Sequence, residues 1–349
     1  MYTELCSWEN LLLAYRKASK GKRGHPNTAA FEFRLEENLL HLQADLLAQT
    51  YRPGGYSSFF IHEPKRRLIS AAPFRDRVVH HALCNLMEPI FEKSFISDSY
   101  ANRVGKGTHR AVNRAQEFAR QYPYVIRFDL RQFFPSIDHQ ILLNILKRKI
   151  SDPQVIWLIQ QILSSGEGVL SEEYEMVYFP GDDLLAAVRP RGLPIGNLTS
   201  QFWANVYLNG FDHFVKRRLG CRAYLRYVDD FLLFGESKAQ LWEWKMAVVD
   251  RLQGLRLMVH AGACPGSVRE GFPFLGFRIW PQIRRVKRGK TLHFARKLRS
   301  MAAQYASGKL DYSKMNASIQ GWVNHVRYAN TIGLRKAMLN KVIFSTWSN

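Results

Sequence analysis

The sequence lacks the features that mark secreted, zinc-bound or membrane-spanning proteins. Its four cysteines, Cys6, Cys84, Cys221 and Cys264, lie far apart without a CxxC pair, which argues for free thiols in a reducing compartment and against a zinc site. No apolar run approaches the ~20 residues of a membrane span, and the N-terminus lacks a signal-peptide layout. A P-loop NTPase is not supported either, because no GxxxxGK(S/T) run occurs. We therefore expect a cytoplasmic protein with no membrane partner.

Acidic residues are scarce relative to basic ones. The 349 residues include 50 Lys and Arg against 29 Asp and Glu, a formal net charge of +21, and the excess extends from Lys17 to Lys341. This charge favours a polyanionic partner, above all nucleic acid, because phosphate contacts require many cations along a groove. With 46% hydrophobic residues, the chain can bury substantial cores, and its length predicts two or three subdomains.

Regular elements can be placed from the spacing of apolar residues. Leu11 and Tyr15 on one stretch, and Leu39 and Leu42 on another, follow the helical period and predict two helices in the first fifty residues. A short two-stranded ribbon with a basic turn is expected over residues 59–69, before a further helix.

A pair of adjacent acids stands inside an apolar, aromatic-rich run. Asp229 and Asp230 follow Tyr227 and Val228 within residues 223–234. This pattern predicts two strands joined by a tight turn that carries the carboxylates. Adjacent carboxylates repel each other, and a divalent cation such as Mg²⁺ relieves that repulsion, usually with substrate phosphates in its shell. An Asp-Asp turn is common, so the motif alone does not establish a metal site.

A third acid supplies the missing ligand. Asp129 closes the apolar strand pattern of residues 124–129, a hundred residues before the acid pair. Carboxylates can bridge two cations roughly 3.5–4 Å apart, and those cations activate an attacking 3′-oxygen and stabilise a leaving pyrophosphate. The pattern therefore predicts a phosphoryl-transfer site with two Mg²⁺ ions, for which Mn²⁺ is the alternative metal.

With these three acids in place, the chain resembles a known family, the reverse transcriptases. The resemblance covers about residues 55–345, and its upstream part is similar to the fingers of bacterial, group II intron-like enzymes. The segments that carry it are Phe128-Asp129 with Phe133-Phe134, the nucleotide-supporting run at 189–201, Tyr227-Val228-Asp229-Asp230, the FLG primer grip at 272–277, and Lys65-Arg66-Arg67 with 74–79.

The resemblance implies an α+β right-hand polymerase with fingers, palm and a helical thumb. Residues 1–123 would form the N-terminal helices and the fingers, part of which returns within about 139–195. Residues 124–282 would form the palm, a split βαββαβ unit with the active site, including an insertion at 165–191. Residues 283–349 would form a basic helical thumb.

The family's metal ligands and primer contacts can be carried over residue by residue. Asp129 and Asp229 would ligate both metals, with Asp230 as the third acid and the Leu130 carbonyl as an extra ligand. The residues that would contact the primer and template are Tyr227, Leu275, Gly276, Arg296 and Lys297.

The nucleotide site is implied in the same way. Lys65 and Arg67 would hold the triphosphate. Phe134 would exclude a ribose 2′-OH, with Phe133 as the alternative because the spacing is ambiguous by one residue. The remaining residues of the nucleotide site would be Ile195, Gly196 and Gln201.

One departure from the family pattern narrows the resemblance. Most reverse transcriptases carry Gln before Gly196 and Pro after Ser200, whereas this chain has Ile195 and Gln201. The variant resembles that of diversity-generating retroelements, whose enzymes copy a template-repeat RNA with frequent errors at adenines, so that the cDNA rewrites a variable region of a target gene. A branched apolar residue in place of an amide removes hydrogen bonds that could steady the nascent pair. The resemblance thus implies error-prone copying.

Partners and alternatives follow from the same resemblance. The chain ends soon after the thumb pattern, so we expect RNA recognition to need a small basic oligomeric accessory protein, alongside the template RNA, the RNA/cDNA duplex and dNTP substrates. Two alternatives stay open. One is a group II intron-like or antiphage reverse transcriptase without adenine mutagenesis, and the other is a non-catalytic RNA-binding scaffold, against which the intact acids argue. Asp182 and Asp183 in the insertion are interpreted as solvated acids.

Overall fold

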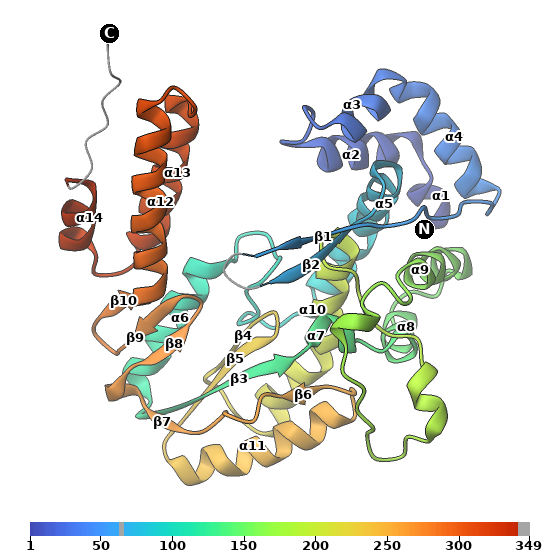
Figure 1. The fold of residues 1–349 in the computed structure, drawn as a ribbon. Coiled ribbons are helices and arrows are strands. Elements are labelled where there is room, and N and C mark those ends of the chain that lie inside the picture. The colour runs from blue at the N-terminus through green and yellow to red at the C-terminus, as the bar shows by residue number, and fades with distance from the viewer. Residues whose placement is uncertain (63–65, 341–349) are drawn as a thin grey trace.

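The computed structural model describes residues 1–62 and 66–340. Lys65, which the resemblance assigns to the triphosphate, lies outside the described residues. The N-terminal helices and the thumb helices rise on opposite sides of a central sheet (Figure 1). None of the helices in the described part of the chain is long and apolar enough to cross a bilayer.

The N-terminal part is helical and carries an exposed two-stranded ribbon. Leu11 and Tyr15, and likewise Leu39 and Leu42, are buried in the main core, which confirms the two predicted helices. The predicted ribbon is also confirmed, with strands β1 and β2 antiparallel. The elements are α1 (Tyr2–Leu5), α2 (Trp8–Ser19), α3 (Pro26–Phe33), α4 (Leu35–Leu47), β1 (Ser57–Ile61), β2 (Arg67–Ala71) and α5 (Phe74–Glu92).

Two later helices return to this N-terminal block. They are α8 (His139–Lys147) and α9 (Pro153–Ser165), whose buried residues belong to the same core as those of α2, α4 and α5. The Tyr2 N–H donates to the Asp152 carboxylate over 2.9 Å, which ties the chain's start to the N-cap of α9.

The central sheet has the split βαββαβ topology that the resemblance implies. Its strand order is β4-β5-β3-β6 with antiparallel neighbours, and β7 pairs with the start of β3. This topology confirms the predicted polymerase palm. Its elements are β3 (Tyr124–Arg131), α10 (Leu198–His213), β4 (Tyr224–Tyr227), β5 (Asp230–Gly235), α11 (Lys238–Gln253), β6 (Met258–Val259) and β7 (Gly266–Ser267).

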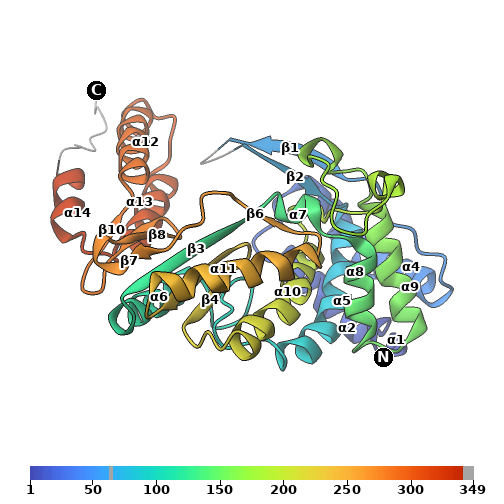
Figure 2. The ribbon, with the colours of Figure 1, turned by 90° about the horizontal axis from the view of Figure 1, so that it is seen from below.

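The two faces of the sheet pack against different helices. Phe128 and Phe231 share the main core with residues of α10 and α11, whereas Val125 and Leu232 share a second core with α6 (Thr108–Gln121). Seen from below, α10 and α11 cover one side of the strands (Figure 2). Because side chains alternate along a strand, Asp129 lies on the face of Val125, away from α10 and α11.

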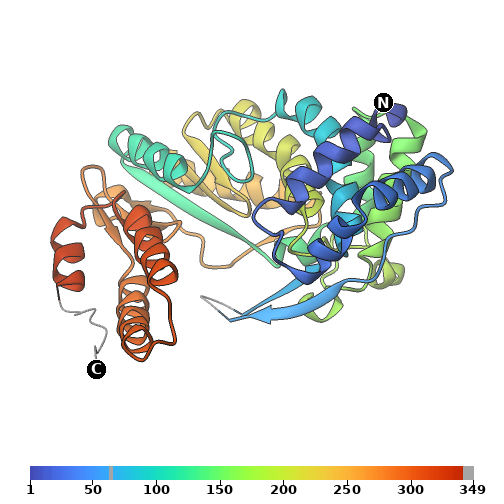
Figure 3. The same ribbon diagram turned by 90° about the horizontal axis from the view of Figure 1, so that it is seen from above.

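The thumb rests on a small sheet of its own. Strands β8 (Phe272–Phe274), β9 (Phe277–Ile279) and β10 (Arg284–Val286) form an antiparallel sheet next to α6. The helices that follow are α12 (Arg288–Ala306), α13 (Tyr312–Val326) and α14 (Ile332–Leu339), seen from above in Figure 3. Trp322 stacks on Phe294 with ring centroids 4.4 Å apart, so Trp322 packs in the thumb core.

The insertion at 165–191 is tied to the palm by buried charges. The expectation that Asp182 is solvated is wrong, because its side chain is only 3% exposed and accepts from Arg189 and Arg256 over 3.0 Å each. The same two guanidinium groups pair with Asp138, which caps α8 by accepting from the Ile141 N–H. The insertion, α8 and the loop after α11 therefore share one ion-pair network.

Neutralising Asp182 should loosen the insertion. The Phe179 N–H and the two arginines hold the pKa of this carboxyl below its usual range. Asp182→Asn is expected to lower the free energy of unfolding by about 1–3 kcal/mol, the cost of losing charged hydrogen bonds at a buried site. A depressed pKa stabilises above the unfolded-state value, so the deficit should shrink as the pH falls below about 4.

Urea unfolding at several pH values and limited proteolysis within 165–191 measure this effect. Glu172→Gln, at an exposed acid of the same insertion, is the matched control. Equal unfolding free energies and cleavage rates for Asp182→Asn, Glu172→Gln and the natural chain would contradict the network's role.

Candidate active site

The acid pair lies at the turn of a tight hairpin. Tyr227 and Asp230 pair at the ends of β4 and β5, and Val228 and Asp229 form the connecting loop. Val228 has φ of +58°, a left-handed conformation that is costly for a β-branched residue. The turn must therefore be held by contacts outside itself.

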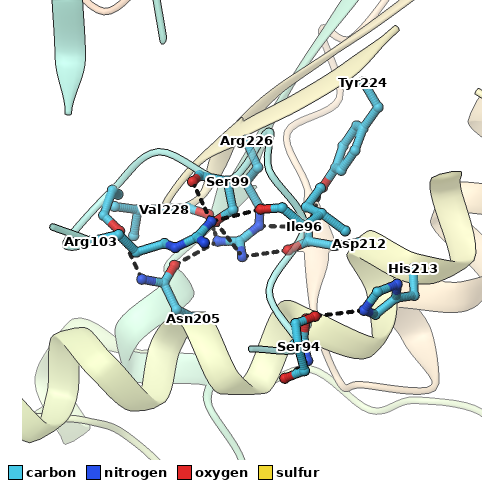
Figure 4. Close-up of polar contacts among 12 residues, drawn as sticks. Ser94, Ile96, Ser99, Arg103, Asn205, Asp212, His213, Tyr224, Arg226 and Val228 are labelled. Carbon is cyan, nitrogen blue, oxygen red and sulfur yellow. Dashed lines mark hydrogen bonds and ion pairs between the residues drawn. The ribbon is translucent and has the colours of Figure 1, made fainter. Parts of the chain in front are cut away.

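A buried arginine supplies those contacts. Arg226 on β4 is 0% exposed and pairs with Asp212 of α10 through Nε and Nη2, each 2.7 Å from a carboxylate oxygen (Figure 4). Its Nη1 donates to the Val228 carbonyl over 3.0 Å and to the side-chain carbonyl of Asn205 over 3.1 Å. The Tyr224 hydroxyl also donates to Asp212, over 2.6 Å. The strained turn is thereby fastened to the helix beneath the sheet.

Strand register brings the third acid to the turn. Asp129 of β3 lies directly opposite Asp230 of β5, and the Leu130 N–H donates to the Asp229 carbonyl over 3.2 Å. The three predicted acids therefore meet at one edge of the palm. Burial raises the pKa of Asp229, and it raises the pKa of Asp230 to about 6, because desolvation disfavours the charged form.

One cation already faces these acids, and the sequence reasoning missed it. Arg127 Nε and Nη2 each lie 2.8 Å from a carboxylate oxygen of Asp230, and Nη2 also lies 3.5 Å from a carboxylate oxygen of Asp129. Asp230 therefore has a cationic partner within the protein, which the sequence analysis did not identify. Alternation along β3 was the available signal, since Arg127 is two residues before Asp129 and must share its face.

The acids suit a hard divalent cation in their chemistry. Within residues 1–62 and 66–340, no group of three or more His, Cys, Asp or Glu side chains is arranged to hold a metal by itself. Mg²⁺ is usually bound by one or two carboxylates, with waters and substrate phosphates completing its shell. Asp129, Asp229 and Asp230 offer such oxygen donors, so the residues fit this metal together with a triphosphate.

The segment expected to support the nucleotide, residues 189–201, packs against the β1–β2 ribbon. The Ser70 N–H of β2 donates to the Ile195 carbonyl over 2.8 Å, and the Asn197 amide bonds the Ser70 carbonyl and the Ala72 N–H. Gly196 has φ of +121°, and a Cβ atom there would lie 3.0 Å from Ile69. These contacts fix the ribbon to the palm beside the acids.

The other predicted nucleotide contacts lie in different surroundings. Arg67 is exposed at the start of β2, and its charge opposes the rise that burial causes in the pKa of Asp229, which places it within electrostatic reach of the acids. Phe133 is buried in the core, whereas Phe134 is partly exposed, so only Phe134 offers surface to a ribose. Gln201 is partly exposed in the first turn of α10.

The predicted primer contacts line the thumb side of the palm. The Tyr227 hydroxyl accepts from Thr108 at the start of α6 over 3.1 Å. Leu275 and Gly276 form the turn between β8 and β9, with φ of +45° and +89°. Arg296 and Lys297 are exposed on α12.

A cavity of about 520 Å³ lies between Asp129 and the first strand of the thumb sheet. Arg127 and Asp129 line it on one side and Phe272 on the other. His260 and Cys264, on the loop between these two sides, also line the cavity. The His260 N–H donates to the Asp129 carbonyl over 2.9 Å. The structure thus leaves space beside the acids on the primer-grip side.

Removing Arg226 should destabilise the palm. Arg226→Met leaves Asp212 buried without its cation, which is expected to cost about 3–5 kcal/mol of unfolding free energy. Arg226→Met combined with Asp212→Leu removes both charges and should recover most of that loss. Primer extension should stay low in the double variant, because the Val228 carbonyl still lacks its donor. A double variant that is stable and fully active would show that Arg226 does not position the turn.

Comparisons with known proteins agree with this geometry. Residues 61–279 match the family described as reverse transcriptase (RNA-dependent DNA polymerase). The chain is 26% identical over 295 residues to protein YkfC of Escherichia coli K12, a match covering 72% of this chain and 74% of that protein. It is 25% identical over 183 residues to the group II intron-encoded protein LtrA of Lactococcus lactis subsp. cremoris, covering 52% and 28%.

Similarities extend to eukaryotic proteins. Nuclear intron maturase 2, mitochondrial, of Arabidopsis thaliana is 27% identical over 173 residues, covering 45% of this chain and 24% of that protein. The chain thus spans about a quarter of the length of the two intron proteins. Apo telomerase from Candida tropicalis superposes with a TM-score of 0.47 at 13% identity, covering 71% and 59%. Because the family match spans more than half of the chain and includes all three acids, this chain belongs to the reverse transcriptases, the RNA-dependent DNA polymerases.

Proposed function

We propose that this reverse transcriptase makes cDNA on a template RNA at Asp129, Asp229 and Asp230, with two Mg²⁺ ions. The observation that carries this assignment is the β3–β5 register, which sets Asp129 opposite Asp230 beside the turn that holds Asp229. Bound Mg²⁺ supplies activation of the primer 3′-oxygen and stabilisation of the leaving pyrophosphate. Mn²⁺ is the alternative ion.

The chain's own residues would orient the reactants. Arg127 balances the charge of Asp230 and holds that carboxylate toward Asp129. Arg67 would bind the triphosphate, since a guanidinium bonds phosphate oxygens in pairs, and Lys65 is proposed for the same task. Phe134 would contact the sugar and exclude a 2′-OH. Together these contacts convert a bimolecular encounter into an oriented one.

We further propose that the enzyme serves a diversity-generating retroelement and copies template adenines with frequent errors. Ile195 and Gln201 support this role, because the side chain of Ile195 has no amide with which to bond the nascent pair. The proposed partners are the template RNA, dNTPs and a small basic oligomeric accessory protein, in the cytoplasm. The alternative is an intron-type or antiphage enzyme that copies accurately.

The metal assignment can be tested by removing one carboxylate. Asp229→Asn is expected to abolish primer extension with Mg²⁺ and dNTPs while largely sparing RNA binding, because the amide cannot replace the anionic ligand. Asp183→Asn, at an exposed acid of the insertion, should keep normal activity. Retained synthesis by Asp229→Asn would sink the two-metal assignment.

The retroelement role can be tested by sequencing cDNA. The purified protein would extend a primer on a defined RNA that contains all four bases. Errors should concentrate opposite template adenines and fall in Ile195→Gln, which restores the amide of other reverse transcriptases. Val188→Gln, an exposed apolar position in the insertion, should leave the error spectrum unchanged.

Accurate products would leave a reverse transcriptase but reject the retroelement role. If the protein alone makes no product, the assay is repeated with candidate template RNA and accessory protein. Continued absence of product there would favour the non-catalytic scaffold.

A further inference from the structure

The helical side of the palm carries a groove far from the catalytic acids. Two adjoining hollows of about 440 and 360 Å³ share Gly210 and Arg251. Their walls come from α5, α8, α10, the π-helical segment Phe214–Arg218 and α11, helices that lie on the near side in the view from below (Figure 2). Asp129 lies on the opposite face of the sheet. The groove is therefore separate from the primer–template site.

The Lys and Arg side chains that line this groove have no acidic counterpart among its lining residues. No Asp or Glu lines either hollow, and no described carboxylate pairs with the cations that do. Lys149 lies over the Phe91 ring and Arg251 over the Phe214 ring, so two of the stems pack on aromatic surface. We call this surface the basic groove, and its exposed cations are Arg148, Lys149, Arg217, Arg218 and Arg251.

A glycine on the floor of the basic groove leaves the backbone of α10 uncovered. Gly210 is exposed within α10, which the π-helical segment continues, and a Cβ atom there would meet nothing within 4 Å. Glycine inside a helix costs about 1 kcal/mol relative to alanine, and no internal contact of the described chain requires it. The bare backbone gives a bound molecule close approach to α10. A π-helical segment is itself frequent at functional sites.

We propose that the basic groove binds a single-stranded flank of the RNA that the enzyme copies. Cations from α11, the π-helical segment and the end of α8 match the repeated charge of a phosphate backbone. The apolar floor, and the Arg251 guanidinium that lies over the Phe214 ring, suit unpaired bases, which stack on aromatic side chains and on guanidinium planes. Such a flank would pass behind the palm and keep the RNA attached while the primer–template duplex moves. The proposal rests on the family's RNA-copying activity and is independent of adenine mutagenesis.

The test compares two primed RNAs that share one duplex. One carries a long single-stranded flank and the other carries none. For the flanked RNA, the slope of log K against log salt should be shallower by about 2 in the variant R148Q/R217Q/R251Q than in the natural protein. Each single-strand phosphate contact contributes ~0.7 to that slope, and three contacts are removed. Binding and extension of the flankless RNA should not change. The matched control R16Q/K147Q/R269Q removes equal charge at exposed positions outside the groove and should behave like the natural protein.

A second variant blocks the groove without changing charge. Gly210→Leu places a side chain in the open floor and should weaken binding of the flanked RNA alone, whereas Gly210→Ala should stabilise the helix with a smaller effect on binding. Photo-crosslinking of the unmodified protein to a 4-thiouridine flank should label peptides of α8, α10 or α11, whether or not the variants fold.

Four results would overturn the proposal. One is an equal loss of affinity in the groove variant and the matched control. Another is no labelling of the groove peptides by the RNA flank. The third is binding of a DNA flank of the same sequence while the RNA flank leaves no footprint. An unchanged salt slope in the groove variant would instead favour an acidic protein segment as the occupant, and would equally reject RNA.

Discussion

The active-site turn depends on one buried ion pair. Arg226 and Asp212 have no exposed surface, and burying two charges is worthwhile only when their geometry and remaining hydrogen bonds are well satisfied. Here the guanidinium also bonds the Val228 carbonyl, and that residue has a backbone conformation it would otherwise avoid. The turn that carries Asp229 is therefore positioned from the interior of the palm, through α10, and the hairpin sequence alone does not account for its placement.

The two faces of the palm sheet have different roles, since one packs against helices and the other presents polar side chains. One face is almost entirely apolar and packs on α10 and α11, which gives the strands a rigid register. The other face is free to present Arg127 and the acids, because only part of it is covered by α6. Of the helices that support the sheet, α11 carries Arg251 into the basic groove, and α10 leads into the π-helical segment that carries Arg217 and Arg218. Catalysis and the proposed RNA contact would thus share one scaffold without sharing a surface.

Local patterns in the sequence were sufficient for part of this architecture. Strand alternation and the acid pair predicted β3, the β4–β5 hairpin and their meeting, and the ribbon and helices of the fingers were predicted by apolar spacing. The partners of buried charges were not predictable, because Asp182 is buried by Arg256, 74 residues away, and no local pattern identifies that contact. Arg127 could have been found from alternation alone. The substrate contacts of Lys65, Arg67 and Phe134 stay predictions.

The thumb has a core of its own, and that core is small. Phe294, Leu298, Met301 and Met315 are its buried members, whereas the palm and N-terminal helices share a far larger one. Elements with few buried apolar contacts open at lower free energy than the rest of a protein. A thumb that holds a template–primer duplex would therefore loosen and re-form while the palm stays folded. Processivity in this enzyme would then be set by the local stability of two helices and not by the strength of its catalytic site.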